Sequence, residues 1–117
     1  MGVDLTLMPL LAKDYWASRD MIRLDRRRAL WDPIAALPQL PIPKPISCYM
    51  ARDKASGKTC YGDVEDTPYG NRMTFTTAGD LLTVKDHKGV QDNWQNKAAW
   101  AYLEHMPRDW PIVLYWS

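Results

Sequence analysis

The closing stretch of the chain decides its fold: residues 92–116 read DNWQNKAAWAYLEHMPRDWPIVLYW. The run Asp92–Gln95 signals the start of a helix that extends to Met106, where Pro107 ends it. Pro111 then leads into a strand over 112–116 whose two faces are both apolar. A strand that is apolar on both faces lies at the centre of its sheet. The stretch therefore predicts an α+β fold that is closed by one helix and one central strand.

The tryptophans of this helix are predicted to have different environments. Projected at about 100° per residue, one broad arc forms the predicted core face. Its members are Trp94, Ala98, Ala99, Tyr102, Leu103 and Met106. Trp100 falls about 60° beyond Leu103 on the same projection, away from the centre of that face. We therefore expect Trp94 in the core. Trp100 is expected either to pack under a loop or to be exposed as an anchor for a partner.

Upstream of this unit, alternating apolar residues predict four further strands, over 3–7, 21–24, 47–52 and 73–76. Two more helical segments are expected. Asp25 is predicted to cap one over 25–37, which Pro33 either kinks or divides into two short helices. Thr77 and Asp80 have the spacing of a capping box that opens a helix over 78–86. Residues 1–117 are therefore predicted to form a single α+β domain, with a mixed or antiparallel sheet of about four to five strands packed on two to three helices.

Two segments are predicted to be irregular. Four prolines between Pro38 and Pro45 predict an extended connection, which also has the spacing of a PxxP ligand. A stiff surface crossing between elements is the favoured interpretation of these prolines. Residues 53–71 have the composition of a long loop, and loops of that length are often functional or mobile.

Composition and charge exclude several classes of protein. The chain has 117 residues, of which 46% are apolar and 25% charged, as in ordinary globular domains. Its net charge of +1 makes nucleic acid an improbable partner. The first residues lack the basic and small-residue features of a secretory signal, and no apolar run reaches the roughly 20 residues that span a bilayer. Cys48 and Cys60 are therefore expected to be free thiols in the cytosol.

No catalytic or metal-binding residue, and no cofactor, is predicted. A Cys–His pair drawn from Cys48 or Cys60 has no local signature, and the two cysteines with two histidines do not have zinc-site spacing. The acidic run around Asp63 lacks EF-hand spacing, so a solvated loop is favoured over a Mg²⁺ or Ca²⁺ site. Residues 56–59, Ser-Gly-Lys-Thr, resemble the end of a phosphate-binding loop but lack its upstream glycine.

The candidate partner-binding residues are basic and aromatic. Arg26, Arg27 and Arg28 form the densest positive cluster, at the start of a predicted helix, where they oppose the helix dipole. Such an unfavourable placement suggests contact with a carboxylate or phosphate, although a solvated helix end is the simpler explanation. Trp100, and Tyr69 in the 53–71 segment, are the other candidates.

Three stretches resemble small accessory proteins encoded by bacteriophages and prophages. They are MGVDLTLMPLL at residues 1–11, DTPYGNRMTFTTAGDLL at 66–82 and NKAAWAYLEHMPRDWPIVLYWS at 96–117. The resemblance covers roughly half of the chain and specifies no activity or site residues. It implies a phage accessory gene, and such genes commonly make proteins that bind and inhibit host machinery, including defence systems.

Three functions are compared on this basis. The leading hypothesis is a non-enzymatic binding protein that occupies a surface of a host protein in the host cytosol. The second is a binder that sequesters a nucleotide-like anion, with Arg26–Arg28 on the phosphates and a Tyr or Trp stacked on the base. The third is a small hydrolase that uses Asp or His side chains.

Overall fold

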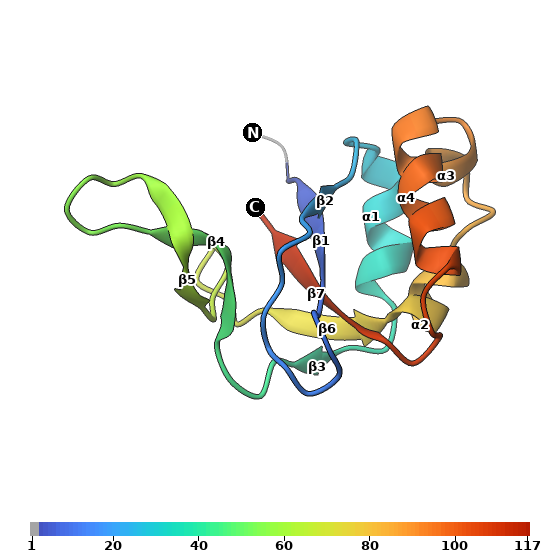
Figure 1. Ribbon diagram of the computed structural model, residues 1–117. Helices are drawn as coiled ribbons and strands as arrows, with labels where there is room; N and C mark the ends of the chain where they lie inside the picture. Colours follow the sequence, from blue (N-terminus) through green and yellow to red (C-terminus); the bar gives the residue numbers. More distant parts are fainter. Residues whose placement is uncertain (1–2) are drawn as a thin grey trace.

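A five-stranded antiparallel sheet forms the centre of the protein, in a computed structural model that describes residues 3–117 (Figure 1). The strands lie in the order β2-β1-β7-β6-β3. Their bounds are β1 Leu5–Pro9, β2 Ile22–Arg23, β3 Leu40–Pro41, β6 Thr74–Thr77 and β7 Pro111–Trp116. The predicted α+β fold is confirmed, and so is the central position of the last strand.

The pair β1–β7 is buried on both faces of the sheet. Leu7 lies opposite Leu114, and both belong to a core on one face of the sheet. Met8 lies opposite Val113, and both belong to a second core on the other face. The continuous apolar run of β7 is therefore explained by two cores that share one strand.

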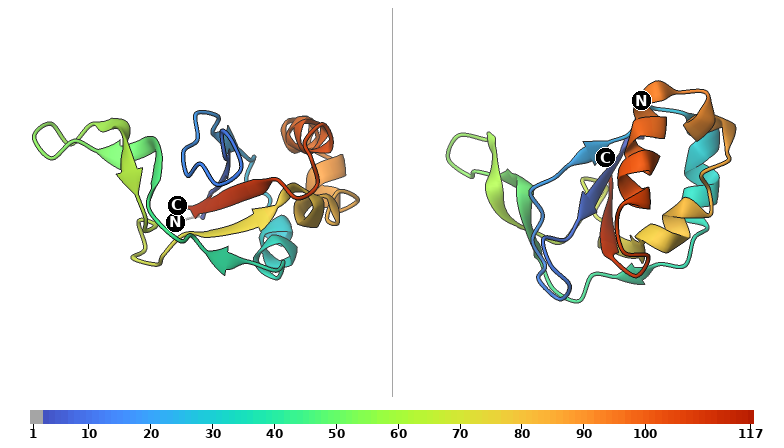
Figure 2. Two further views of the ribbon diagram at one scale, coloured as in Figure 1. Left: turned by 60° about the horizontal axis from the view of Figure 1, so that its bottom comes forward. Right: turned by 45° about the vertical axis from the view of Figure 1, so that its right-hand side comes forward.

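Four helices pack on the first face of the sheet, as the right-hand view of Figure 2 shows. They are α1 Arg28–Ala35, α2 Ala78–Leu82, α3 Lys88–Gln91 and α4 Trp94–Glu104. The predicted cap of α2 is confirmed, since the Thr77 hydroxyl accepts a hydrogen bond from the Asp80 amide. The longest, α4, has 11 residues, and no helix within residues 3–117 is long and apolar enough to cross a membrane.

The segment predicted as helical over 25–37 forms one helix, not two. It begins at Arg28, and the residue at its cap position is Arg27, without a side-chain hydrogen bond to the helix. Pro33 lies inside it. The missing Pro33 donor would have reached the carbonyl of Ala29, an exposed residue, and the helix continues through Pro33 to Ala35. The prediction that Asp25 caps this helix is wrong, because Asp25 bonds to α4 instead.

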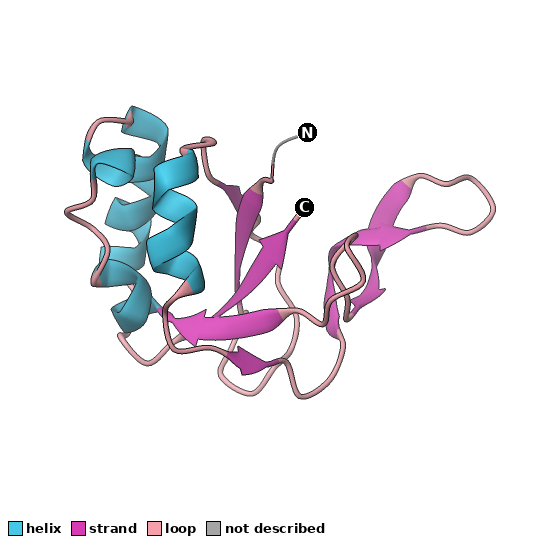
Figure 3. Ribbon diagram, turned by 180° about the vertical axis from the view of Figure 1, so that it is seen from behind, coloured by secondary structure: helices cyan, strands magenta, loops and turns pink. Residues whose placement is uncertain are grey.

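A β-hairpin stands on the other face of the sheet, apart from the helices (Figures 2 and 3). It consists of β4 Ile46–Arg52 and β5 Thr59–Val64. The prediction of a long loop over 53–71 is therefore wrong, since β5 occupies its middle. The base of the hairpin is held by Ile46 and Cys48, which are buried in the second core. Its tip is a turn in which Asp53 accepts from the Ser56 amide and Gly57 has a φ of 70°.

Candidate functional site

A cleft of about 310 Å³ lies between the start of α1 and α3. We call it the basic cleft. Its lining combines residues from the two helices and the segment after α3: Arg27, Arg28, Ala29, His87, Lys88, Gly89 and Asp92. The cleft therefore brings together two of the three predicted arginines with Lys88 and His87, neither of which was a predicted partner-binding residue.

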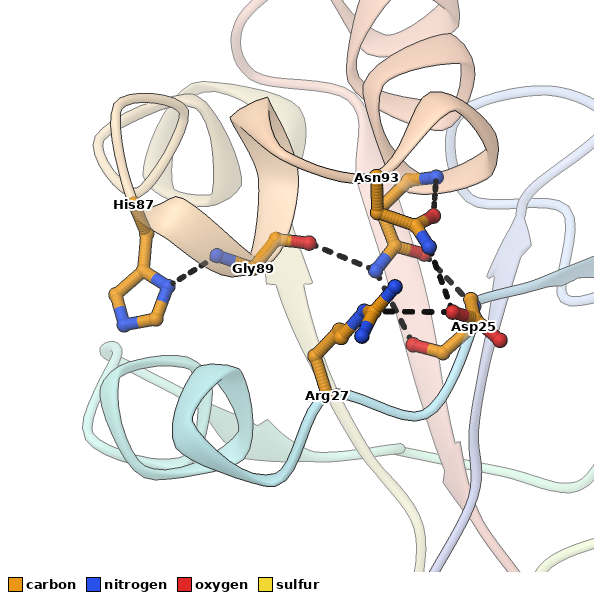
Figure 4. A network of polar contacts seen from close by, with 6 residues as sticks. Asp25, Arg27, His87, Gly89 and Asn93 are labelled. Atoms are coloured by element: carbon orange, nitrogen blue, oxygen red, sulfur yellow. Dashed lines mark hydrogen bonds and ion pairs between the residues drawn. The ribbon is translucent and has the colours of Figure 1, made fainter.

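A network of buried amides holds the walls of the basic cleft together (Figure 4). The Asn96 side chain accepts from the Asp25 amide at 2.7 Å and donates to the Asp25 and Gly89 carbonyls at 3.1 and 2.9 Å. Asn93 donates to the Asp25 carboxylate at 2.6 Å and caps α4 through the Asn96 amide. Because the network joins α4 to the residues before α1 and to α3, it determines the position of the arginines.

Gly89 permits the close approach of α3 to α1. A Cβ at this position would lie 2.9 Å from the Leu30 Cβ and 3.3 Å from the Arg27 Cβ, and these two atoms belong to α1 or its cap position. The His87 Nδ1 accepts from the Gly89 amide at 2.9 Å and caps α3. With Nδ1 occupied, the Nε2 atom is the His87 nitrogen that remains for a ligand.

The basic cleft has a positive charge that its own residues do not neutralise. Arg27 lies 3.4 Å from the Asp25 carboxylate, in a half-exposed ion pair. Within residues 3–117, Arg28 and Lys88 form no ion pair, and Asp92 is the one acidic residue in the lining. The first turn of α1 contains no acidic residue. The side chains and the partial charge of the helix start therefore all favour an anion here.

Arg26 does not take part in the basic cleft. Its guanidinium lies 3.0 Å from the Asp4 carboxylate, which also contacts Arg23 at 2.7 Å. Burial alone would raise the pKa of Asp4, but the hydrogen bonds and charges of Arg26 and Arg23 outweigh burial and hold the pKa below its ordinary value. The predicted Arg26–Arg28 cluster is therefore divided between a structural ion pair and the basic cleft.

Trp94 is the exposed tryptophan of α4, and the prediction that it lies in the core is wrong. Trp94 is 80% exposed, whereas Trp100 is 2% exposed and donates its indole N–H to the Leu81 carbonyl at 2.9 Å. The inward face of α4 consists of Asn96, Ala99, Trp100 and Leu103. Because the buried amide of Asn96 belongs to the inward face, the helix is rotated from the orientation that its apolar residues alone predict. Trp100 is therefore a core residue, and it presents no surface to a partner.

The outer side of α4 forms an exposed apolar stripe, which we call the α4 face. It comprises Trp94, Ala98, Ala101 and Tyr102, all exposed and spaced to lie on one side of a helix. At its start, Trp94 follows Asp92 of the basic cleft by two residues, so their Cα atoms lie within about 7 Å of each other. At its end, Tyr102 lines a groove of about 280 Å³ together with Leu11, Met106 and Trp110. The α4 face therefore begins close to Asp92, at the edge of the basic cleft.

Tyr69 lies elsewhere. It is exposed, in the turn between β5 and β6. The backbones of Asp66 and Arg72 form an isolated β-bridge across this turn. Figures 1 and 3 place this turn beside the hairpin, at the opposite end of the molecule from α1 and α3. The structure does not bring Tyr69 together with the arginines.

The candidate catalytic groups are dispersed. Cys48 is buried, and burial raises the pKa of its thiol, which disfavours the nucleophilic thiolate. Neither cysteine lines the basic cleft. Within the described part of the chain, no three His, Cys, Asp or Glu side chains gather in a way that would hold a metal ion. The arrangement at the basic cleft is suited to binding an anion.

Comparisons with known proteins identify no relative. The chain matches no family model, no curated protein and no solved structure. The geometry of the site therefore carries the functional argument.

Proposed function

We propose that this chain is a non-enzymatic binding protein of the phage accessory type, which inhibits or modulates a host protein in the host cytosol by occupying its surface. The observation that carries the proposal is the 80% exposed Trp94 at the start of α4, two residues after Asp92 of the basic cleft. Tryptophan and arginine are the residues that most often dominate the energy of protein interfaces. An exposed tryptophan has a large apolar surface that a partner can bury.

The partner is expected to have a complementary surface. An acidic group would enter the basic cleft and contact Arg28 and Lys88, while an apolar pocket would receive Trp94. Ala98 and Tyr102 would extend the apolar contact along α4. Charged groups at the edge of such an interface mainly steer association, and the buried aromatic contributes most of the affinity.

Sequestration of a nucleotide-like anion is the second candidate, and the lining of the basic cleft favours it less. Two arginines and a lysine suit a phosphate. However, the residues that line the basic cleft include no Tyr or Trp to stack on a base. A protein partner would contact both the positive side chains of the basic cleft and the exposed Trp94.

Affinity capture from a bacterial host lysate, followed by mass spectrometry, tests the proposal. A stoichiometric partner is expected to bind the unmodified chain and to be lost with Trp94→Ala, because truncating an aromatic hot spot costs about 2 kcal/mol or more. The double variant Arg28→Gln/Lys88→Gln is expected to slow association and to reduce its dependence on salt.

Matched controls are available on surfaces away from α4. Tyr49→Ala removes an exposed aromatic from the hairpin, and Arg19→Gln removes an exposed cation from a loop, so neither should change capture. Equal capture by Trp94→Ala and the unmodified chain would contradict the proposal. Absence of any partner, together with a thermal shift of several degrees by a cyclic nucleotide, would favour sequestration.

A further inference from the structure

A second cavity, of about 410 Å³, lies between the hairpin and the face of the sheet opposite the helices. The base of the hairpin packs on this face through Ile46 and Cys48, but its outer half stands away from β1 and β7 (Figures 1 and 3). The lining comes from both sides: Thr6, Met21, Arg23, Met50, Arg52, Thr59, Pro68, Tyr115 and Ser117. We call it the hairpin cavity, and its volume is within the range of small-molecule sites.

Two residues that line the hairpin cavity are largely buried, but their hydroxyl oxygens stay open to solvent. Thr6 and Tyr115 lie opposite each other on β1 and β7, and they are 3% and 8% exposed. Within residues 3–117, neither hydroxyl makes a hydrogen bond, although neither is among the oxygens shut off from solvent. Both hydroxyl groups are therefore free to bond to water or to a ligand that enters the cavity.

The side chains that line the hairpin cavity have a net positive charge. Arg52 from the hairpin and Arg23 from β2 line it, and no Asp or Glu does. Arg23 already contacts Asp4, whereas no ion pair of Arg52 is found in the described part of the chain. Burial raises the pKa of Tyr115 and the Cys48 side chain adds to the rise, while the Arg52 guanidinium opposes it, so Arg52 lies within electrostatic reach of the phenol.

The remaining lining is apolar. Met21 and Met50 are half-buried on opposite sides of the cavity, and Pro68 adds a third apolar surface. Methionine side chains adapt to ligands of irregular shape. A purely inorganic anion would leave these surfaces unused, while a neutral apolar molecule would leave Arg52 and the two hydroxyls unpaired.

We propose that the hairpin cavity is a binding site for a small organic anion that carries a carboxylate on an apolar body. The carboxylate accepts from the Arg52 guanidinium and from the hydroxyls of Thr6 and Tyr115. The apolar body lies between Met21 and Met50. This site is separate from the basic cleft and does not depend on the protein-binding function proposed above.

Titration with phenylbutyrate, followed by heteronuclear NMR, tests the site. Resonances of Thr6, Met50, Arg52 and Tyr115 are expected to shift together. Two probes separate the parts of the ligand: phenylbutyramide lacks the charge, and acetate lacks the apolar body. Each should bind at least about fivefold more weakly than phenylbutyrate, because each leaves one part of the cavity unsatisfied.

Variants locate the binding. Arg52→Gln is expected to weaken phenylbutyrate about five- to thirtyfold, and Tyr115→Phe about two- to tenfold, because each removes one hydrogen bond to the carboxylate. Lys54→Gln removes a neighbouring exposed cation outside the lining and should leave the affinity unchanged. Arg28→Gln should also leave it unchanged, because Arg28 belongs to the basic cleft.

Several results would overturn the proposal: equal affinity for the amide and the carboxylate, unchanged affinity in Arg52→Gln, or no shift of these resonances up to about 10 mM probe. Shifts confined to α1 and α3, abolished by Arg28→Gln, would assign the anion to the basic cleft and would also overturn it. None of these results changes the expectation that Trp94→Ala abolishes capture of a protein partner.

Discussion

Trp94 and Trp100 lie on the same helix and have opposite environments. Trp100 is surrounded by core residues, and its indole N–H bonds to the Leu81 carbonyl, so α4 is joined to α2 through one side chain. Trp94 has most of its surface in solvent. The two residues therefore allow the effect of a buried tryptophan on stability to be compared with that of an exposed one on the same helix.

Substitution of the two tryptophans should affect stability very differently. Trp100→Ala is expected to lower the free energy of unfolding by about 3–5 kcal/mol, since it leaves a cavity in the core and removes the indole hydrogen bond to the Leu81 carbonyl. Trp94→Ala should change it by no more than about 0.5 kcal/mol, as is usual for exposed positions. Urea denaturation of the two variants measures both values. A larger loss for Trp94→Ala than for Trp100→Ala would contradict the burial described here.

Asn96 is the residue that sequence reasoning could least anticipate. It is fully buried and its side chain makes three hydrogen bonds, two to the backbone of Asp25 and one to the Gly89 carbonyl in α3. An asparagine in a helix normally indicates an exposed position, because an unpaired buried amide is costly. Its partners come from distant parts of the chain, so no local pattern shows that the amide is satisfied.

At the scale of elements, β5 shows why a strand can resemble a loop. Its residues alternate between exposed and half-buried, with Tyr61 on the outer side and Gly62 and Val64 on the inner side. The strand is stabilised by pairing with β4, and Tyr61 contacts Tyr49 edge to face at 5.3 Å. Glycine and acidic residues lower local strand propensity, and only the cross-strand partner compensates for them.

The contact between α1 and α3 depends on one glycine. Gly89→Ala is expected to lower the free energy of unfolding by about 1–3 kcal/mol, because the new methyl group would meet the Leu30 Cβ at 2.9 Å. It should also weaken anion binding at the basic cleft, since α3 would move away from Arg27 and Arg28. Lys88→Ala is the matched control for stability, as its side chain is exposed.

Thermal denaturation and phosphate titration of the two variants measure these effects. Lys88→Ala should keep the stability and lose affinity for phosphate, whereas Gly89→Ala should lose both. A fully stable Gly89→Ala variant would show that α3 tolerates displacement and that the close approach is not required.

At the scale of the whole molecule, one sheet supports two cores of different character. The face that carries the helices holds the larger core, and α1, α3 and α4 present the basic cleft and the α4 face on its outer side. The opposite face carries the hairpin, which encloses the hairpin cavity at its outer half. The two candidate sites therefore lie on opposite sides of β1 and β7.

The Asp4 ion pairs should make the stability of the whole molecule sensitive to acid. The folded pKa of Asp4 lies below the unfolded value of about 3.9, so its stabilisation is present above about pH 4 and is lost as the pH falls through the folded pKa. Asp4→Asn is thus expected to lower the melting temperature at neutral pH. The difference from the unmodified chain should shrink as the pH falls below about 4.

A double-mutant cycle assigns this effect to the ion pairs. In an Arg23→Gln/Arg26→Gln background, Asp4→Asn should cost much less at neutral pH, because its partners are already absent. A loss in melting temperature by Asp4→Asn that does not depend on pH would show that the Asp4 carboxylate stabilises the fold in another way. A loss that persists in the Arg23→Gln/Arg26→Gln background would show the same.

The sequence by itself determined the elements that have strong local signals. The central strand β7, the strand β4, the Thr77 cap of α2 and the α+β class follow from apolar periodicity and capping residues. Tertiary structure decided which side of α4 faces inward, the pairing of β5, and the meeting of Arg27 and Arg28 with Lys88. These features depend on hydrogen bonds and side-chain packing between residues far apart in the chain, and such contacts leave no local pattern in the sequence.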